Sequence, residues 1–257
     1  MPLSHILILV AASFGAGVMN AMAGGGTILT FPVLIFLGLP GIAANATSTV
    51  ALLPGAASSL FGYRREVREH RRWLKTLFVP SLVGGALGSV LLLRTPEKVF
   101  AYLAPALILF ATALFMIQGA VSRRAAVGDG IQEQSSRRWI VASLLQFAVA
   151  VYGGYFGAGI GILMLALLGF LGLSDIHAAN GLKNFFGLCI NSVAAAYFIL
   201  KGAVVWPIAL VTIVGATLGG YAGARFARRI GKEKARAAVV VIGLLVTAIL
   251  LWQQIGR

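Results

Sequence analysis

The chain has 257 residues, of which 59% are hydrophobic and 11% are charged, and its mean hydropathy is +0.93. A soluble domain is typically about 25% charged, so this composition excludes a water-soluble globular protein and indicates a polytopic membrane protein. No stretch is polar enough to form a separate soluble domain.

The formal net charge of +14 is concentrated in three short stretches. Sixteen of the 21 Lys and Arg residues lie in 64–75, 119–138 and 225–236. Basic residues in short loops beside apolar segments mark the cytoplasmic side of a membrane protein. The charge therefore predicts topology and contact with anionic lipid headgroups, and nucleic acid is not an expected partner.

Ten apolar segments are predicted to be membrane helices or parts of them. In chain order they cover residues 3–22, 26–38, 43–62, 74–94, 97–118, 138–156, 159–172, 177–200, 203–224 and 235–254. The first lacks a basic start and a small-residue cleavage site, so we expect a membrane segment and not a cleaved signal peptide. The second and seventh fall short of the roughly 20 residues that span a bilayer, and each follows a glycine cluster. This pattern is typical of discontinuous or re-entrant helices in transporters.

The two halves of the chain repeat each other. Phe-Leu-Gly-Leu begins at Phe36 and again at Phe170, and Ala-Ala-Asn ends at Asn45 and again at Asn180. Each half holds five segments, and an odd number makes the second half enter the membrane from the opposite side. We therefore predict an all-α polytopic membrane protein with two inverted repeats of five hydrophobic segments each. The repeats cover 1–118 and 138–257, a cytoplasmic linker covers 119–137, and both termini face outward.

Polar residues on the third and eighth segments are candidates for ligand binding. Lys183 is the charged side chain that falls inside an apolar segment, and Ser48 stands at its equivalent in the first half. Asn180, Lys183 and Asn184 share one arc of a helix, about 100° wide. An intramembrane cation indicates a functional site for an anion, and amide and hydroxyl donors beside one positive charge match an oxyanion.

Inverted symmetry is expected to bring the two polar faces together. The predicted substrate-binding residues are Lys183, Asn180, Asn45, Asn184, Ser48, Thr49, Gly25, Gly26, Gly159 and Gly161. Other interpretations stay open. The lysine could snorkel to the cytoplasmic interface, the asparagines could join helices by hydrogen bonds, and the glycines could serve close packing.

Four motifs carry a resemblance to a known family. They are the glycine cluster 24–26 followed by Thr27 and Pro32, the Ala-Asn-Ala-Thr-Ser run at 44–48, Gly-Ala-Gly-Ile-Gly at 157–161, and Ala-Asn-Gly-Leu-Lys-Asn at 179–184. Through them the chain resembles the sulfite exporter TauE/SafE family over nearly its whole length. The resemblance implies movement of sulfite, sulfonates or related organosulfur anions across the bacterial cytoplasmic (inner) membrane. It does not fix which anion is moved.

The expected function is a secondary transporter, an exporter, that binds the anion between the repeats and moves it by alternating access. All seven acidic residues are expected in loops, so coupling through an intramembrane carboxylate is not expected. An inside-negative potential favours anion export by about 2.3 kcal/mol per 100 mV. The alternatives are an anion channel, a transporter of a non-sulfur anion and a lipid-phosphate translocator.

An enzyme is not expected. Its chemistry would need a nucleophile–base pair, metal ligands or paired haem histidines within the membrane, and the apolar segments carry none of these. No catalytic residue, metal site or cofactor is therefore predicted. The expected partners are a small anionic substrate, the lipid bilayer and, as an option, a second copy of the chain in a homodimer.

Overall fold

The computed structural model describes residues 3–23, 25–126, 136–173, 175–230 and 232–255. These residues form α-helices joined by short connections, with no strand among them. The helices are α1 (Leu3–Ala23), α2 (Gly26–Phe36), α3 (Gly41–Gly62), α4 (Arg64–Glu69), α5 (Arg71–Arg94), α6 (Glu97–Ala126), α7 (Ser136–Tyr155), α8 (Ile160–Phe170), α9 (Ile176–Leu200), α10 (Trp206–Ile230) and α11 (Lys232–Ile255). Gly24 and residues 127–135 of the predicted linker lie outside the described residues.

Ten of these helices coincide with the ten predicted apolar segments, and the prediction of an all-helical chain is confirmed. Several helices continue beyond the apolar limits, because Arg, Lys and Ala are good helix formers and keep the helix going into water. Thus α5 begins at Arg71 and α6 extends to Ala126. The short helix α4 was not predicted, since five of its six residues are charged and it carries one apolar residue, Val67.

Helices α2 and α8 are short, as the sequence predicts. Each has 11 residues, which at about 1.5 Å per residue is about 16 Å, roughly half of the bilayer's hydrocarbon thickness. Helix α8 follows Gly157 and Gly159, both with a φ of +79°, a conformation that favours glycine. Both short helices also end alike, because Leu39 donates to the Leu34 carbonyl and Leu173 to the Leu168 carbonyl. These are the bonds of a glycine-terminated helix cap.

The long helices pack across the two halves of the chain. Helix α1 packs most extensively against α10, and α7 against α5. Glycines allow the backbones to touch: a Cβ on Gly219 would overlap the Phe14 carbonyl, and a Cβ on Gly88 would overlap the Val151 carbonyl. Such small residues at helix contacts are a feature of membrane bundles. The first helix of each half therefore rests on a late helix of the other half.

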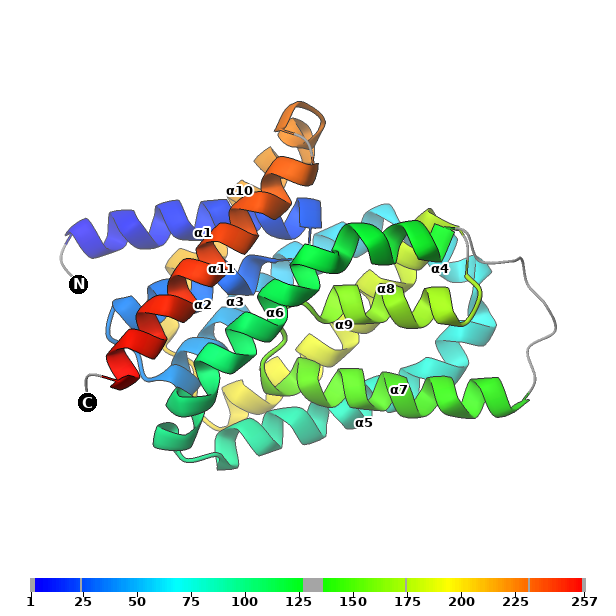
Figure 1. The fold of residues 1–257 in the computed structure, drawn as a ribbon, viewed down its shortest axis with the longest axis horizontal. Helices are drawn as coiled ribbons and strands as arrows, with labels where there is room; N and C mark the ends of the chain where they lie inside the picture. Colours follow the sequence, from blue (N-terminus) through cyan, green and yellow to red (C-terminus); the bar gives the residue numbers. More distant parts are fainter. Residues whose placement is uncertain (1–2, 24, 127–135, 174, 231, 256–257) are drawn as a thin grey trace.

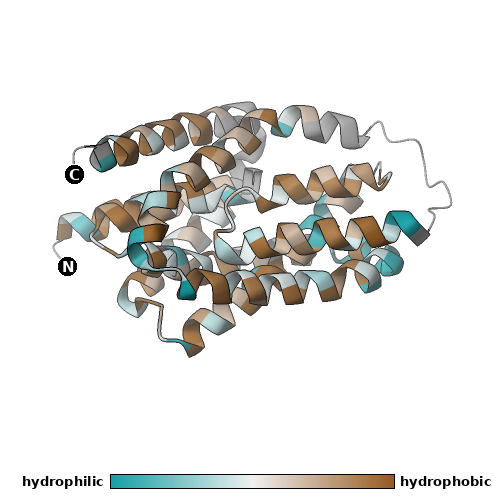
Figure 2. Ribbon diagram, turned by 60° about the horizontal axis from the view of Figure 1, so that its bottom comes forward, coloured by the Kyte–Doolittle hydropathy of each residue, from teal (hydrophilic) through white to brown (hydrophobic). Residues whose placement is uncertain are grey.

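The outer surface of the bundle is apolar. Figure 2 shows hydrophobic residues along most of the helices, with hydrophilic residues gathered mainly at helix ends. Among the described residues, four helical stretches are long and apolar enough to cross a bilayer: Leu3–Asn20, Arg71–Arg94, Glu97–Ala120 and His177–Leu200. Four further apolar helical stretches are shorter: Gly26–Phe36, Ile160–Phe170, Trp206–Ala222 and Ala237–Trp252. The chain is thus a multi-pass membrane protein.

The helix ends define two opposite sides of the bundle. Helix α1 begins and α11 ends on one side, whereas α4 and the starts of α5, α7 and α9 gather on the other (Figure 1). On that second side the Arg72 guanidinium lies 5.1 Å from the Trp139 ring centroid. The predicted cytoplasmic stretch 64–75 therefore contacts α7 at Trp139, the residue that follows the stretch 119–138. The side chains of the third, 225–236, lie outside what the structure describes.

Candidate functional site

Lys183 lies near the start of α9 and is half-buried. Its Nζ donates to Asn180 Oδ1 at 3.0 Å, which places the ammonium over the first turns of its own helix. The aliphatic stem passes Gly161 of α8, where an added Cβ would lie 3.2 Å from Lys183 Cδ. The absence of a side chain at Gly161 therefore makes the room in which the lysine lies. The structure brings three predicted residues, Lys183, Asn180 and Gly161, to one place.

The polar arc of α9 continues beyond Lys183 into its middle turns. Asn184, Gly187 and Asn191 are half-buried. A Cβ on Gly187 would meet no atom within 4 Å, so there is open space beside the helix at this level. Asn191 Oδ1 lies 3.8 Å from where a Gly157 Cβ would stand, so the arc extends to the broken connection between α7 and α8.

On the first half, Asn45 of α3 is 1% exposed. Its Nδ2 donates to the carbonyl oxygen of Tyr155, at the end of α7, at 2.9 Å. That bond joins the third helix of one half to the helix break of the other. Asn45 Oδ1 is buried and has no hydrogen-bond partner among the described residues. One turn later, Thr49 Oγ1 donates to the Asn45 backbone carbonyl at 2.9 Å.

Ser48, the counterpart of Lys183, is fully buried. Its Oγ lies 2.5 Å from Thr30 Oγ1 of α2, and Thr30 Oγ1 donates to the Gly26 carbonyl at 3.2 Å. Ser48 therefore contacts the short helix of its own half, as Lys183 contacts α8. Helices α3 and α9 pack against each other.

The other three predicted glycines lie at helix contacts. A Cβ on Gly25 would stand 2.8 Å from Phe115 Cζ, one on Gly26 would stand 3.1 Å from the Ala16 carbonyl, and one on Gly159 would stand 3.2 Å from Leu114 Cδ1. Each contact belongs to another helix, α6 or α1. These positions allow α2 and α8 to begin close to their neighbours, and among the four predicted glycines Gly161 is the one that borders Lys183.

Sequence reasoning missed α4, which packs against the start of α9. A Cβ on Gly181 would lie 3.3 Å from atoms of Tyr63 and Val67 and 3.6 Å from Glu66 Cβ. The expectation that the acidic residues lie in loops is wrong for Glu66 and Glu69, which belong to this helix. It is also wrong for Glu97 and Glu233, which lie in the first turns of α6 and α11. The one available signal was Val67, a single apolar residue in a basic run that marks the buried face of an amphipathic turn.

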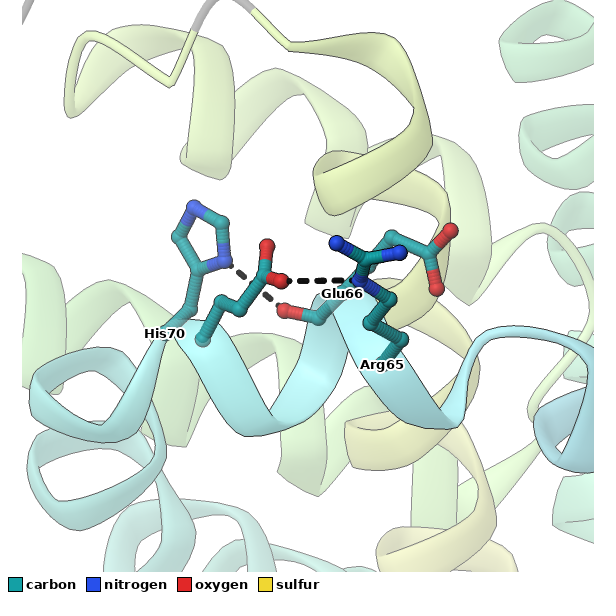
Figure 3. Close-up of polar contacts among 4 residues, drawn as sticks. Arg65, Glu66 and His70 are labelled. Atoms are coloured by element: carbon teal, nitrogen blue, oxygen red, sulfur yellow. Dashed lines mark hydrogen bonds and ion pairs between the residues drawn. The ribbon is translucent and has the colours of Figure 1, made fainter.

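The outward face of α4 is basic and hollowed. A hollow of about 310 Å³ is lined by Arg64, Arg65, Arg68 and Glu69. Arg65 Nε pairs with Glu69 Oε1 at 3.2 Å, and His70 Nδ1 lies 2.8 Å from the Glu66 carbonyl (Figure 3). A positively charged concavity raises the local concentration of anions, and this one adjoins the end of α9 that carries Lys183.

The start of α9 is fixed by a local cap. Asp175 Oδ1 accepts a hydrogen bond from the His177 backbone N–H at 2.8 Å, which satisfies one of the free amides of the first turn. The start of α3 is capped from a distance: the Glu97 carboxylate of α6 accepts from the backbone N–H groups of Gly41 and Ile42. Among the described residues no group of three or more His, Cys, Asp or Glu side chains could hold a metal ion.

A family model and several membrane transporter proteins are similar to this chain over nearly its whole length. The family model for the sulfite exporter TauE/SafE family matches residues 9–250. A probable membrane transporter protein of Haemophilus influenzae is 28% identical over 250 residues, covering 97% of this chain and 95% of the relative. One from a Sinorhizobium species is 27% identical over 250 residues, covering 96% and 93%. One from Escherichia coli K12 is 26% identical over 260 residues, covering 97% and 91%. No solved structure matches the chain.

Proposed function

The chain belongs to the sulfite exporter TauE/SafE family, and from this premise we propose that it is a secondary transporter that exports sulfite, sulfonates or related organosulfur anions. The observation that carries the proposal is Lys183, a half-buried ammonium on α9 that lies against Gly161 and donates to Asn180. An ammonium within an apolar membrane segment is costly, so a functional role is its expected explanation.

The anion site is assigned to the polar arc of α9. The Lys183 ammonium supplies charge and three donors, and the Asn180 and Asn184 amides supply further donors. A lysine holds an oxyanion as a point charge on a flexible stem, without a rigid two-pronged clamp, and release is therefore easy. The open space beside Gly187 gives the bound anion room along the same arc.

Alternating access requires two parts that rock about a central site, and we assign these parts to two inverted repeats. Support comes from the reciprocal packing of α1 on α10 and α7 on α5, which is the exchange that a two-fold axis in the membrane plane would produce. Support also comes from the short helices α2 and α8, which occupy matching places. In this arrangement α3 and α9 are the helices that flank the axis.

The direction of transport follows from charge. We place the side that carries α4 in the cytoplasm of a bacterial inner membrane, with both termini outside, because the basic residues of 64–75 and 137–138 gather there. The Arg-lined hollow of α4 then faces the cytoplasm and collects anions beside the start of α9. An inside-negative potential expels each negative charge with about 2.3 kcal/mol per 100 mV, so export needs no coupled ion.

Thermal unfolding of the purified protein with a panel of anions tests the proposal. Sulfite, thiosulfate, sulfoacetate, taurine, sulfate, phosphate and chloride are each added to wild type, Lys183→Ala and Lys201→Ala. Lys201 is an exposed lysine at the far end of α9, so its removal is the control for loss of one positive charge. Binding at about 100 times Kd stabilises the folded state by about 2.7 kcal/mol, which raises Tm by roughly 5–10 °C in a protein of this size.

We expect at least one sulfur oxyanion to raise the Tm of wild type and Lys201→Ala and to leave Lys183→Ala unchanged. Silence across the panel would contradict the assignment of a sulfur substrate. An equal rise in Lys183→Ala would contradict the assignment of the site to the α9 arc.

A further inference from the structure

The two asparagines of the repeated Ala-Ala-Asn motif differ in their partners. Asn180 Oδ1 accepts a hydrogen bond from the Lys183 ammonium at 3.0 Å. Asn45 Oδ1, its counterpart in the first half, is buried and has no hydrogen-bond partner among the described residues. The orientation of the Asn45 amide is fixed by its Nδ2, which donates to the Tyr155 carbonyl. The first half therefore carries the equivalent amide oxygen, but it lacks the lysine ammonium that binds this oxygen in the second half.

The hydroxyl groups beside Asn45 are also oriented as acceptors. Thr30 uses its proton on the Gly26 carbonyl, so the short contact between Thr30 and Ser48 must use the Ser48 proton. Ser48 Oγ then presents only lone pairs to its remaining neighbours. Because Asn45 and Ser48 are three residues apart on one helix, they share a face and are neighbours on it. Two buried oxygens, both acceptors, therefore lie on the same side of α3.

A buried acceptor such as Asn45 Oδ1 needs a partner, which is either a hydrogen-bond donor or a cation. An unsatisfied polar atom in the interior costs free energy, and buried polar groups in native proteins are almost always paired. In the second half the partner is the ammonium of Lys183. We propose that in the first half a sodium ion occupies the equivalent place, held by Asn45 Oδ1 and Ser48 Oγ beside Thr30.

The chemistry of the oxygens favours a small monovalent ion. The ligands are neutral amide and hydroxyl oxygens, and the hydrogen bonds of Asn45, Ser48 and Thr30 among the described residues involve no carboxylate. A divalent ion would bring two positive charges into a site without a compensating anion. The side chains of Asn45 and Ser48 are almost fully buried, which favours a compact ion. The nearby helix break, whose Tyr155 carbonyl already meets Asn45, is the type of irregular backbone at which transporters bind sodium.

This site goes beyond the anion site proposed above and does not depend on the substrate. It sits between α3 and α2, whereas the anion site lies on α9. A bound sodium would link the two first-half helices through Ser48 and Thr30, as Lys183 links α9 to α8. Each half would then carry one positive charge. In the second half it is the covalently attached ammonium of Lys183, and in the first half it is an exchangeable sodium ion.

The experiment measures Tm of the purified protein without any substrate anion, at constant ionic strength. Sodium chloride is titrated against potassium chloride and against N-methyl-D-glucamine chloride. Wild type, Ser48→Ala, Asn45→Ala and Ser13→Ala are compared. Ser13 is the matched control, since its hydroxyl is also buried without a hydrogen-bond partner among the described residues but belongs to α1.

We expect sodium alone to raise the Tm of wild type and Ser13→Ala by about 5 °C at saturation, and Ser48→Ala to lose most of that response. Equal Tm values of wild type in the three salts would overturn the proposal, and this comparison needs no variant to fold. A sodium response that survives in both Ser48→Ala and Asn45→Ala would overturn the placement of the ion. Since no sulfur anion is present, failure here leaves the anion test with Lys183 unaffected.

Discussion

At the scale of single residues, the side chains at equivalent positions of the repeat act differently. Lys183 is half-buried and reaches an amide oxygen of its own helix, whereas Ser48 is fully buried and reaches a hydroxyl of α2. The donors of Asn45 and Ser48 are engaged by Tyr155 and Thr30. The proposed anion site therefore draws its donors from the second half, and the first half supplies acceptors.

Substitution of Gly161 tests the place of the lysine without removing its charge. A Cβ at this position would already lie 3.2 Å from Lys183 Cδ, so Gly161→Val should push the stem off α8. We expect the affinity for the stabilising anion to fall about tenfold, the effect of losing about 1.4 kcal/mol of binding. Isothermal titration calorimetry of the purified variants measures this affinity.

The matched control for that substitution is Gly55→Val. A Cβ on Gly55 meets nothing within 4 Å, and Gly55 is also in a helix, so the cost of a β-branched residue is comparable. Equal affinities of Gly161→Val and wild type would show that the position of the Lys183 stem is unimportant for binding.

For the helices, the sequence predicts where each one lies along the chain better than it predicts which helices contact each other. Ten apolar segments matched helices because a run of apolar residues is a local property of the chain. The bond from Asn45 to Tyr155 joins residues 110 positions apart, and no local pattern announces it. Helix α4 was missed because its single apolar residue, Val67, gives no periodicity. The roles of the glycines at helix contacts likewise depended on which helices are neighbours.

The remote cap on α3 gives a prediction at this scale. The Glu97 carboxylate accepts from the first two backbone N–H groups of α3, so Glu97→Ala leaves them without this partner. Loss of a side-chain cap costs about 1 kcal/mol, which should lower Tm by roughly 2–4 °C. Glu69→Ala is the control, because Glu69 makes an exposed pair with Arg65 and such pairs contribute little. Equal Tm values for the two variants would show that the cap does not stabilise the protein.

The contact between α5 and α7 gives a second prediction about stability. A Cβ on Gly88 would overlap the Val151 carbonyl, and since backbone cannot give way as a side chain does, Gly88→Ala must separate the helices. Overpacking of this kind typically costs about 1–3 kcal/mol. In Gly55→Ala the new methyl group has free space, so the gain in helix propensity should leave stability equal or higher. Thermal unfolding of both variants checks this, and a Gly88→Ala variant as stable as wild type would contradict the close packing described here.

At the scale of the whole molecule, the charges and the packing favour one orientation. The basic residues of 64–75 and 137–138 lie at one end of the bundle, and α1 begins and α11 ends at the other (Figure 1). The reciprocal pairs α1 with α10 and α5 with α7 agree with two repeats of opposite direction. The inverted repeat stays a prediction from motif spacing. Which helices of the two halves pack together could not be predicted, because pairing depends on three-dimensional neighbours.

Cysteine labelling in intact bacterial cells tests the orientation. Cys189, the single cysteine, is first replaced by Ser, and then Arg65→Cys or Lys201→Cys is introduced, both at exposed positions. A membrane-impermeant maleimide should label Lys201→Cys directly and Arg65→Cys only after the membrane is made permeable. The reverse order would place α4 outside and contradict the proposed direction of export.

We propose that Lys183 binds a sulfur oxyanion which the protein carries across the membrane. The most direct measurement is the flux of ³⁵S-labelled sulfite, or of the anion that stabilises the purified protein, into proteoliposomes under an imposed inside-positive potential. We expect saturable, potential-driven uptake by wild type and Lys201→Ala, and uptake at the level of protein-free vesicles by Lys183→Met. Equal uptake by Lys183→Met and wild type, or no uptake by wild type for any sulfur oxyanion, would contradict this proposal.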